Sequence, residues 1–368
     1  MNILHITSVH ARNDTRIFNK MCQSLAADGA EVTLIMADGL GDAVVGGVEI
    51  VDVGGSGTRV DRMIRAVRRV AGAAATRSPD IIHFHDPEFI QMIPALRKTG
   101  AKIVMDAHED VEKQIFSKPY LHPATRKLVS LAYSLVERRM IRHVDLVIGA
   151  TPAISAKFEG QGLRTATVNN FPILGELAVP DIDWTLKQPV ACYVGGMSAI
   201  RGASQVGQAA ALLEPPITIE FAGGFAPPEL GETVATLGGD RIKRLGHLDR
   251  EQVRDLMARS MAGIVTFLPA PNHMDAQPNK MFEYMSAGLP VIASDFPLWR
   301  QIIAEADCGI LVDPMDPKAI ADAINALVND PERAERLGRN GQRAVRERYN
   351  WASEFATLQN AYERLIAA

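Results

Sequence analysis

Two kinds of hydrophobic pattern alternate along the chain. Short runs of β-branched and apolar residues, typical of buried strands, are separated by longer segments whose apolar residues recur at helical spacing. In the first half, the pattern predicts strands at 2–7, 31–36, 48–53, 80–84, 102–106 and 145–149, with helices at 15–27, 60–76, 89–98 and 124–142. Alternating strands and helices predict a parallel sheet covered by helices on both faces.

The pattern dissolves between 169 and 189, where prolines mark an interdomain connection. A second alternating series follows, with strands at 190–194, 218–221, 241–245, 263–268 and 291–293, and helices in the tail at 317–328, 331–348 and 351–366. We therefore expect an α/β protein with two doubly wound parallel-sheet domains. The expected limits are 1–172 for the first domain, 173–189 for a linker, 190–348 for the second domain, and 349–368 for a C-terminal helix that is a candidate for packing back on the first domain.

Composition narrows the class of protein. A chain of 368 residues exceeds one typical core, and 47% hydrophobic with 22% charged residues is the composition of a globular protein. The net charge of −4 argues against bulk nucleic-acid binding. Cys22, Cys192 and Cys308 form no Cys-x-x-Cys pair, so neither a disulfide framework nor a zinc site is indicated. The N-terminal residues are expected to form a first strand and not a signal peptide, and no apolar run reaches the length of a membrane-spanning helix.

The most informative stretch is 272–294, which follows the strand predicted at 263–268 and predicts a polar loop, a helix and a second strand. Asn279 and Lys280 lie at the expected helix N-terminus, which favours an anion. Asp275 and Glu283 bracket that terminus and offer carboxylates to hydroxyl groups. Together these features suit a phosphorylated, hydroxyl-rich ligand such as a nucleotide sugar, although a solvated loop before an ordinary surface helix is the alternative.

Glycine pairs or Gly-His follow three earlier strands of the second series. They are Gly195-Gly196, Gly223-Gly224 and Gly246-His247. Glycines allow close backbone approach, and Arg201, followed by Gly202, lies near a helix start where it suits a diphosphate. In a parallel sheet these strand ends meet at one edge, which is where ligands bind.

The first half also has polar strand ends. Asp14 is expected either to cap the helix that follows it or to lie with Arg12 and Arg16 in a phosphate-binding loop. His83, His85 and Asp86 end one strand, and Asp106 to Asp110 end the next, with His108 as our choice for contact with a transferred group. A metal site formed by His83, His85 and His108 is the less favoured alternative, because no fixed ligand spacing supports it.

An amphipathic helix is predicted near residues 59–71. One face holds Val60, Met63, Ile64, Val67, Val70 and Ala71, and the opposite face holds Arg59, Arg62, Arg65 and Arg69. A helix that packs on the sheet and has a solvated basic face explains this pattern. The alternative is contact between the arginine face and an anionic membrane surface.

In order, the motifs of the second half resemble the donor domain of the family 4 glycosyltransferases. The resemblance rests on Gly195-Gly196, Arg201-Gly202, Gly223-Gly224, Gly246-His247, Asp275…Pro278-Asn279-Lys280…Glu283, and 288–293. In the first half, residues 14–18, 85–88 and 108–110 also resemble this family. The resemblance implies the two-domain GT-B fold, with the two domains facing a cleft, and sugar transfer that retains anomeric configuration without a metal.

The resemblance also implies roles for individual residues. Glu283 would bind the donor ribose, Asp275 takes the place of a family glutamate that meets the donor sugar, and Arg201 would hold the diphosphate. The family often has an arginine where this chain has Gly196, and Lys280 or Arg16 would supply that charge. The implied catalytic residues are His108 and Asp275. The implied donor-binding residues are Gly196, Arg201, Gly202, Gly223, Gly224, His247, Asn279, Lys280 and Glu283, and those on the acceptor or phosphate side are Arg16, Asp86 and Glu109.

We accordingly expect a retaining hexosyltransferase that uses a UDP- or GDP-sugar and needs no metal cofactor. The expected acceptor is a glycan, lipid-linked, in the assembly of a cell-surface polysaccharide such as lipopolysaccharide or capsule. The expected location is the cytoplasm, with peripheral contact to the inner face of the plasma membrane. A nucleotide-sugar epimerase or hydrolase on the same fold and a non-catalytic nucleotide-sugar-binding subunit remain alternatives.

Overall fold

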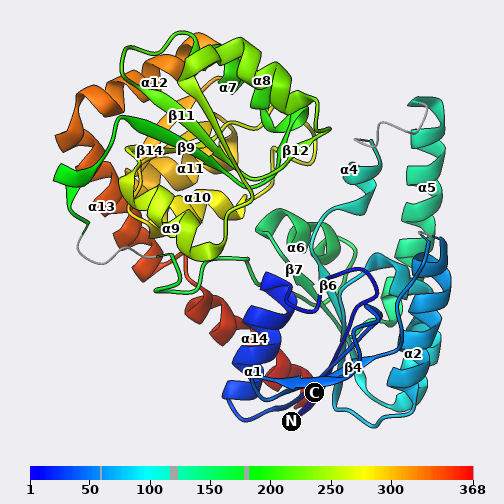
Figure 1. Ribbon diagram of the computed structural model, residues 1–368. Coiled ribbons are helices and arrows are strands. Elements are labelled where there is room, and N and C mark those ends of the chain that lie inside the picture. The colour runs from blue at the N-terminus through cyan, green and yellow to red at the C-terminus, as the bar shows by residue number, and fades with distance from the viewer. Residues whose placement is uncertain (59, 117–122, 178–181, 368) are drawn as a thin grey trace. The chain divides into compact units, whose positions relative to one another are not determined.

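The computed structural model describes residues 1–58, 60–116, 123–177 and 182–367. The chain forms two compact units, one of Met1–Asn170 with Ala352–Ala368 and one of Phe171–Trp351 (Figure 1). The described residues of the segment 173–189, expected to be an interdomain linker, belong to the second unit. Among the described residues, no helix has the length and apolar content needed to cross a membrane.

The first unit contains one sheet with the strand order β3-β4-β2-β1-β5-β6-β7-β8. All neighbouring pairs are parallel except the antiparallel pair β3–β4. The strands are β1 (Asn2–Ile6), β2 (Glu31–Met36), β3 (Ala43–Val45), β4 (Val48–Asp52), β5 (Ile81–Phe84), β6 (Lys102–Ala107), β7 (Leu146–Gly149) and β8 (Thr165–Thr167). The predicted strands are present, and the short edge strands β3 and β8 are additional.

The helical segments of this unit are more irregular than the periodicity predicts, because several begin or end as π-helical or 3₁₀ turns. They are η1 (Thr15–Cys22), α1 (Gln23–Ala27), η2 (Asp61–Ala66), α2 (Val67–Ala75), η3 (Pro87–Met92), α3 (Ile93–Leu96), η4 (Arg97–Thr99), α4 (Val111–Phe116), α5 (Pro123–Met140), η5 (Ile141–His143), α6 (Pro152–Glu159) and α14 (Trp351–Ile366). The last helix, α14, is part of the first unit, where the Tyr362 hydroxyl lies 2.6 Å from His83 Nδ1.

The amphipathic helix of residues 59–71 differs from the prediction. Its second half packs as expected, with Val67 and Val70 fully buried. The apolar residues of its first half, Val60, Met63 and Ile64, are exposed, so the predicted apolar face continues only partly into the core. Periodicity shows which residues share a face of a helix, and it does not show how far the sheet extends beneath that face.

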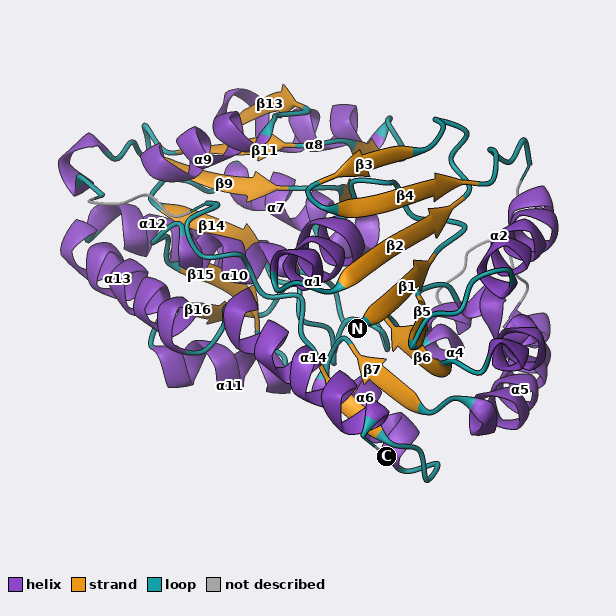
Figure 2. Cartoon of the chain, turned by 90° about the horizontal axis from the view of Figure 1, so that it is seen from below, coloured by secondary structure: helices purple, strands orange, loops and turns teal. Residues whose placement is uncertain are grey.

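The second unit contains a parallel sheet of six strands in the order β13-β11-β9-β14-β15-β16, which Figure 2 shows side by side. These strands are β9 (Val190–Val194), β11 (Thr218–Ala222), β13 (Ile242–Gly246), β14 (Ala262–Val265), β15 (Val291–Ser294) and β16 (Gly309–Val312); a separate short pair is formed by β10 (Met197–Ser198) and β12 (Phe225–Ala226). The prediction of two parallel sheets is confirmed.

Helices cover both faces of this second sheet, and alternate strand residues point to opposite faces. Cys192 and Val194 of β9 pack in one core with helices α9, α10 and α11, whereas Ala191 and Tyr193 pack in another with α7, α8 and α12. The helical segments are η6 (Trp184–Leu186), η7 (Ala199–Arg201), α7 (Ala203–Ala210), α8 (Leu230–Gly238), η8 (Gly239–Arg241), α9 (Arg250–Arg259), α10 (Asn279–Ser286), α11 (Pro297–Ala306), α12 (Pro317–Asn329) and α13 (Pro331–Glu347). The order of the strands brings the loops after β11, β9 and β14 together at one edge.

Candidate active site

The loops at the carboxyl edge of the second sheet approach one another so closely that two glycines are required. A Cβ atom on Gly223, whose φ is +139°, would lie 2.2 Å from the carbonyl oxygen of Gly195. A Cβ atom on Gly202, whose φ is +75°, would lie 2.0 Å from the carbonyl oxygen of Thr266. The ends of β9, β11 and β14 therefore form one continuous backbone surface, to which Gly224 adds a position with open space beside it.

Two cationic side chains face the Gly195-Gly196 turn on this surface. Arg201 donates from Nη1 to the carbonyl oxygen of Gly196 at 3.0 Å, and its backbone is held because the Tyr193 hydroxyl donates to the Arg201 carbonyl oxygen at 2.8 Å. The Nζ atom of Lys280 would lie 3.5 Å from a Cβ atom on Gly195. Two basic side chains are thus directed at one glycine turn, which directly follows β9.

Lys280 is buried, and its ammonium nitrogen has no hydrogen-bond partner among the described residues. It lies 4.0 Å from the centre of the Tyr193 ring. Burial, together with the charge of Arg201, lowers the pKa of Lys280 to about 7. A buried cation without an acceptor among the described residues, beside a second cation, is unfavourable and is the arrangement that an anion would stabilise.

The other predicted residues of this unit lie on helix α10, in the loop before it and after β13. The helix begins at Asn279 after Pro278, and no side chain caps it, so its first backbone N–H groups are available for an anion. Glu283 is partly exposed and accepts a hydrogen bond from Arg250 Nη1 at 3.1 Å. Asp275 lies exposed in the preceding loop, and His247 is exposed after β13. Of the residues that form this surface, Tyr193 and Thr266 were not predicted.

In the first unit, Asp106 is the centre of a buried polar network at the end of β6. Its carboxylate accepts hydrogen bonds from Arg16 Nη2 at 2.7 Å, Arg16 Nε at 2.9 Å, His85 Nδ1 at 3.0 Å and His108 Nε2 at 2.9 Å. Although burial acts in the opposite direction, the charge of Arg16 and the bonds from the histidines hold the pKa of Asp106 well below its usual value. An ionised carboxylate only accepts hydrogen bonds, so Nε2 of His108 carries a proton.

This network changes the expected role of Arg16. Its guanidinium is buried and also donates to the Val168 carbonyl oxygen at 2.8 Å, so it supports the structure in place of the phosphate contact that we expected. Asp14 accepts hydrogen bonds from the backbone nitrogens of Arg16 and Ile17, both at 2.9 Å, and so caps η1. Arg12 is likewise engaged, with Asp38.

A second histidine, which we did not predict, lies beside His108. The imidazole centres of His10 and His108 are 5.1 Å apart, and both side chains are partly exposed. His10 Nδ1 lies 2.8 Å from Asp86 Oδ1, and Asp86 also accepts from the Ser8 backbone nitrogen, so Asp86 is a buried brace for His10. Glu109, the third residue expected on the acceptor side, is exposed. His10 stands in the loop after the first strand, which is where the rule of carboxyl strand ends would have found it.

The histidines also bear on the metal alternative. His85, Asp106 and His108 present ligand atoms within 4.8 Å of one another, and so do His5, His83 and His85. Both oxygens of Asp106 are bonded to Arg16, and His83 Nδ1 lies 2.6 Å from the Tyr362 hydroxyl. A cation at the first of these groups would have to compete with the guanidinium of Arg16 for the same carboxylate.

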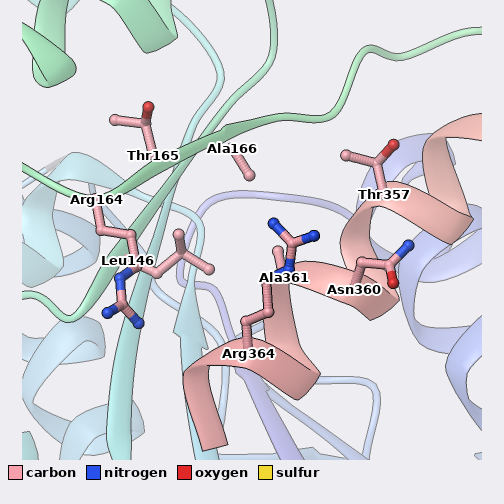
Figure 3. Close-up of a pocket in the computed structure, with 8 residues that line it drawn as sticks. All are labelled: Leu146, Arg164, Thr165, Ala166, Thr357, Asn360, Ala361 and Arg364. Carbon is pink, nitrogen blue, oxygen red and sulfur yellow. The ribbon is translucent and has the colours of Figure 1, made fainter. Parts of the chain in front are cut away.

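A cavity of about 560 Å³ in the first unit lies between β7, β8 and α14 (Figure 3). Its lining includes Arg164 and Arg364, whose guanidinium groups point in different directions and do not converge on one ligand. Leu146, which also lines the cavity, is the first residue of β7, whereas His108 follows the last residue of the parallel strand β6. The cavity and His108 therefore lie at opposite edges of the sheet. The cavity contains none of the predicted site residues.

Comparison with known proteins identifies both units. The model of a glycosyl transferase 4-like domain matches residues 15–172, and the model of glycosyl transferases group 1 matches residues 179–344. The chain is 27% identical to D-inositol 3-phosphate glycosyltransferase of Corynebacterium urealyticum over 62% of this chain and 54% of that protein. It spans about half the length, or less, of the first curated relatives that it matches.

Solved structures show the same fold at lower sequence identity. Sucrose-phosphate synthase of Thermosynechococcus elongatus superposes with a TM-score of 0.82 at 20% identity, over 100% of this chain and 99% of that one. HepE of Anabaena, in complex with UDP-glucose, superposes with a TM-score of 0.73 at 18% identity over all of both chains. With family models that match both units, this chain belongs to the family 4 glycosyltransferases and has their GT-B fold of two Rossmann-like domains.

Proposed function

We propose that the protein transfers a sugar, with retention of configuration and without a metal, from a nucleoside-diphosphate sugar to a hydroxyl group of a glycan. The observation that carries this proposal is the pair of cations at the Gly195-Gly196 turn, one of which, Lys280, is buried without an acceptor. A diphosphate would supply that acceptor. Lys280 would then replace the arginine that the family often has where this chain has Gly196.

The remaining donor contacts follow from this placement of the diphosphate. Negative charge that develops on the leaving diphosphate would be stabilised by the uncapped N-terminus of α10, by Arg201 and by Lys280. In metal-dependent transferases a metal ion stabilises this charge. Glu283 would accept hydrogen bonds from the ribose hydroxyls, and Asp275 from those of the sugar. HepE, which shares the fold, has been crystallised with UDP and with UDP-glucose, and this supports a uridine nucleotide as the first donor to test, beside the guanosine nucleotide expected as the alternative.

In the first unit, His108 would meet the transferred sugar. Its Nε2 atom is bonded to Asp106, and its Nδ1 atom makes no hydrogen bond to the described residues. If the ring is neutral, Nδ1 is an acceptor, so His108 would accept a hydrogen bond from a sugar hydroxyl, with Asp106 fixing the tautomer and the orientation of the ring.

For the acceptor we propose a glycan carried on a lipid, at a membrane surface. The arginine face that suggested membrane contact is only partly available, because Arg69 donates to the carbonyl oxygens of Val53, Gly54 and Gly55, and Arg59 lies outside the described residues. Apolar side chains give better support. Val60, Met63 and Ile64 around η2 and Val129, Leu131, Leu135 and Val136 on α5 are all exposed, and Arg138 and Arg139 follow them in the last turn of α5.

The transfer reaction is tested by incubating the protein with UDP- and GDP-sugars, a lipid-linked glycan fraction and EDTA. We expect a glycosylated product whose new linkage has the anomeric configuration of the donor. Release of free sugar at the same rate without acceptor would indicate a hydrolase, an altered donor sugar would indicate an epimerase, and activity only with added divalent metal would contradict metal-independent transfer.

The membrane proposal has its own test in sedimentation with vesicles that contain anionic phospholipid. Leu131→Asp/Leu135→Asp should reduce the fraction of protein that pellets with the vesicles, because it places charge on the exposed apolar face of α5. Leu186→Asp is the control, since Leu186 is also an exposed leucine but lies in the second unit. Equal pelleting of the wild type, Leu131→Asp/Leu135→Asp and Leu186→Asp would contradict the proposal that α5 contacts the membrane.

A further inference from the structure

In the second unit, the guanidinium of Arg250 lies between two carboxylates. Its Nε and Nη2 atoms both donate to Glu176 Oε1, at 2.9 and 2.6 Å, and its Nη1 atom donates to Glu283 Oε1 at 3.1 Å. Arg250 is therefore the only residue for which the described structure shows a side-chain hydrogen bond to Glu283. No described residue donates to Oε2 of Glu283.

The backbone around each of the three side chains is fixed by packing. Arg250 is the first residue of α9, and a reciprocal pair of bonds between Asp249 and Gln252 sets the start of that helix. Glu283 lies between Phe282 and Tyr284, both of which are buried, and the residue after Glu176, Leu177, is buried as well. The bridge from Glu176 through Arg250 to Glu283 thus joins three positions of one unit that are next to buried residues or at an ordered helix start.

We infer that Arg250 is a positioning residue, which holds the carboxylate of Glu283 in the orientation that binds a ribose diol. This inference rests on the proposed function, in which Glu283 meets the ribose. A glutamate side chain with one oxygen held by Arg250 keeps its other oxygen free as an acceptor for a hydroxyl group. Without Arg250, Glu283 would sample several rotamers, and ligand binding would bear the cost of ordering it.

Charge supports the same role. Glu176 and Glu283 bond to the same guanidinium group, so removing Arg250 would leave two like charges facing each other and would favour a movement of Glu283 away from Glu176. Glu176 orients Arg250 and does not contact Glu283 itself. It accepts two of the three Arg250 hydrogen bonds and so leaves only Nη1 to donate to Glu283. The arginine fork is needed for this bridge, and a lysine cannot reproduce it.

The test compares dissociation constants for UDP and 2′-deoxy-UDP, and for GDP and 2′-deoxy-GDP, in the wild type and in Arg250→Ala. The wild type should prefer the ribonucleotide, because Glu283 contacts the hydroxyl that the deoxy form lacks. Arg250→Ala should weaken ribonucleotide binding by about three- to tenfold and leave binding of the deoxy form nearly unchanged, which is the range for one coupled polar pair. Arg250→Lys should recover only part of the preference, and Glu176→Gln should show a smaller loss in the same direction.

Matched controls separate this role from general damage to the fold. Arg254→Ala removes another exposed arginine one turn along α9 and should change neither constant. In the Glu283→Gln background, Arg250→Ala should add no further loss. Circular dichroism and the thermal midpoint show whether each variant is folded. If Arg250→Ala does not fold, Glu176→Gln still tests the inference.

The outcomes distinguish this inference from the proposed function. If the wild type binds no nucleotide, or does not distinguish ribose from deoxyribose, the assigned role of Glu283 fails and the inference fails with it. If the wild type distinguishes them and Arg250→Ala does so equally well, the proposed function stands and Arg250 does not position Glu283. Equal weakening of both nucleotides by Arg250→Ala also overturns the inference, since it would place Arg250 in contact with another part of the ligand.

Discussion

The ammonium nitrogen of Lys280 lies 4.0 Å from the centre of the Tyr193 ring, and no described residue accepts a hydrogen bond from it. Tyr193 is in β9 and also holds the backbone of Arg201, so a single aromatic side chain contacts both residues that carry positive charge to the Gly195-Gly196 turn. The ring stabilises a cation less well than an anion would. We therefore expect Lys280 to gain a proton and an anionic partner together.

Nucleotide binding should consequently be accompanied by proton uptake. With a pKa of about 7, about nine-tenths of Lys280 is neutral at pH 8 in the free protein. A bound diphosphate raises that pKa, so uptake should approach one proton per nucleotide at pH 8, and affinity should decrease as the pH rises above 7. Calorimetry in buffers of different ionisation enthalpy measures this uptake. A binding enthalpy that is independent of the buffer, in the wild type as in Lys280→Met, would contradict the prediction.

The two adjacent glycines after β11 should respond differently to substitution by alanine. Gly223→Ala places a Cβ atom 2.2 Å from the Gly195 carbonyl oxygen at a strained φ, so it must displace the turn that both cations face. We expect nucleotide affinity to decrease by about tenfold or more. Gly224→Ala meets open space and should change affinity by less than about twofold. The comparison is made by titration calorimetry, and similar effects at the two positions would show that the close approach of the loops is unimportant for binding.

Asp106→Asn should destabilise the first unit strongly. The substitution leaves the buried guanidinium of Arg16 without its charge partner, which typically costs about 3–5 kcal/mol. Asp38→Asn is the control, because Asp38 makes a similar two-bond contact with Arg12 but is partly exposed, where such pairs contribute less than about 1 kcal/mol. Urea unfolding measures both. A loss below about 1 kcal/mol for Asp106→Asn would mean that the network contributes little to stability.

His10 should make the stability of the protein depend on pH. Burial lowers the pKa of His10, but its hydrogen bond to Asp86 and the charge of that carboxylate outweigh burial, so the pKa is raised. The added stability is fully present below the unfolded pKa of about 6.5 and is lost as the pH rises through the folded pKa. His10→Gln should therefore lower the thermal midpoint more at pH 6 than at pH 8.5. The exposed His143→Gln is the control, and equal shifts at the two pH values would refute the prediction.

The sequence predicted the two parallel sheets because their strands are buried apolar runs, and it predicted α10 because Pro278 and Gly288 mark its ends. It did not predict the edge strands β3, β8 and β16, of which β3 and β8 are only three residues long, although Gly46-Gly47 between β3 and β4 is a recognisable hairpin signal. The exposure of Met63 and Ile64 was also missed, since a helical pattern identifies a face and not what covers it.

The candidate site was less accessible to prediction than the fold. His108 at a strand end and Lys280 at a helix start were proposed as site residues because the rules for carboxyl strand ends and helix N-termini need only local patterns. The pairing of Arg16 with Asp106 joins positions 90 residues apart and depends on the strand order β1-β5-β6, so the sequence suggested a phosphate contact for Arg16 instead. The bond from Arg250 to Glu283 is also non-local, because it joins residues on two different helices that are 33 positions apart.

The central claim is that the Gly195-Gly196 turn, Arg201 and Lys280 hold the diphosphate of a nucleotide sugar without a metal. Its most direct test is the dissociation constant of UDP and of GDP in the presence of EDTA, for the wild type, Lys280→Met and Lys187→Met. Lys187 is the matched control, a half-buried lysine beside the Trp184 ring. We predict that one nucleotide binds the wild type and Lys187→Met alike, and binds Lys280→Met about 10- to 100-fold more weakly. Binding that requires a divalent metal, or that is unchanged in Lys280→Met, would contradict the claim.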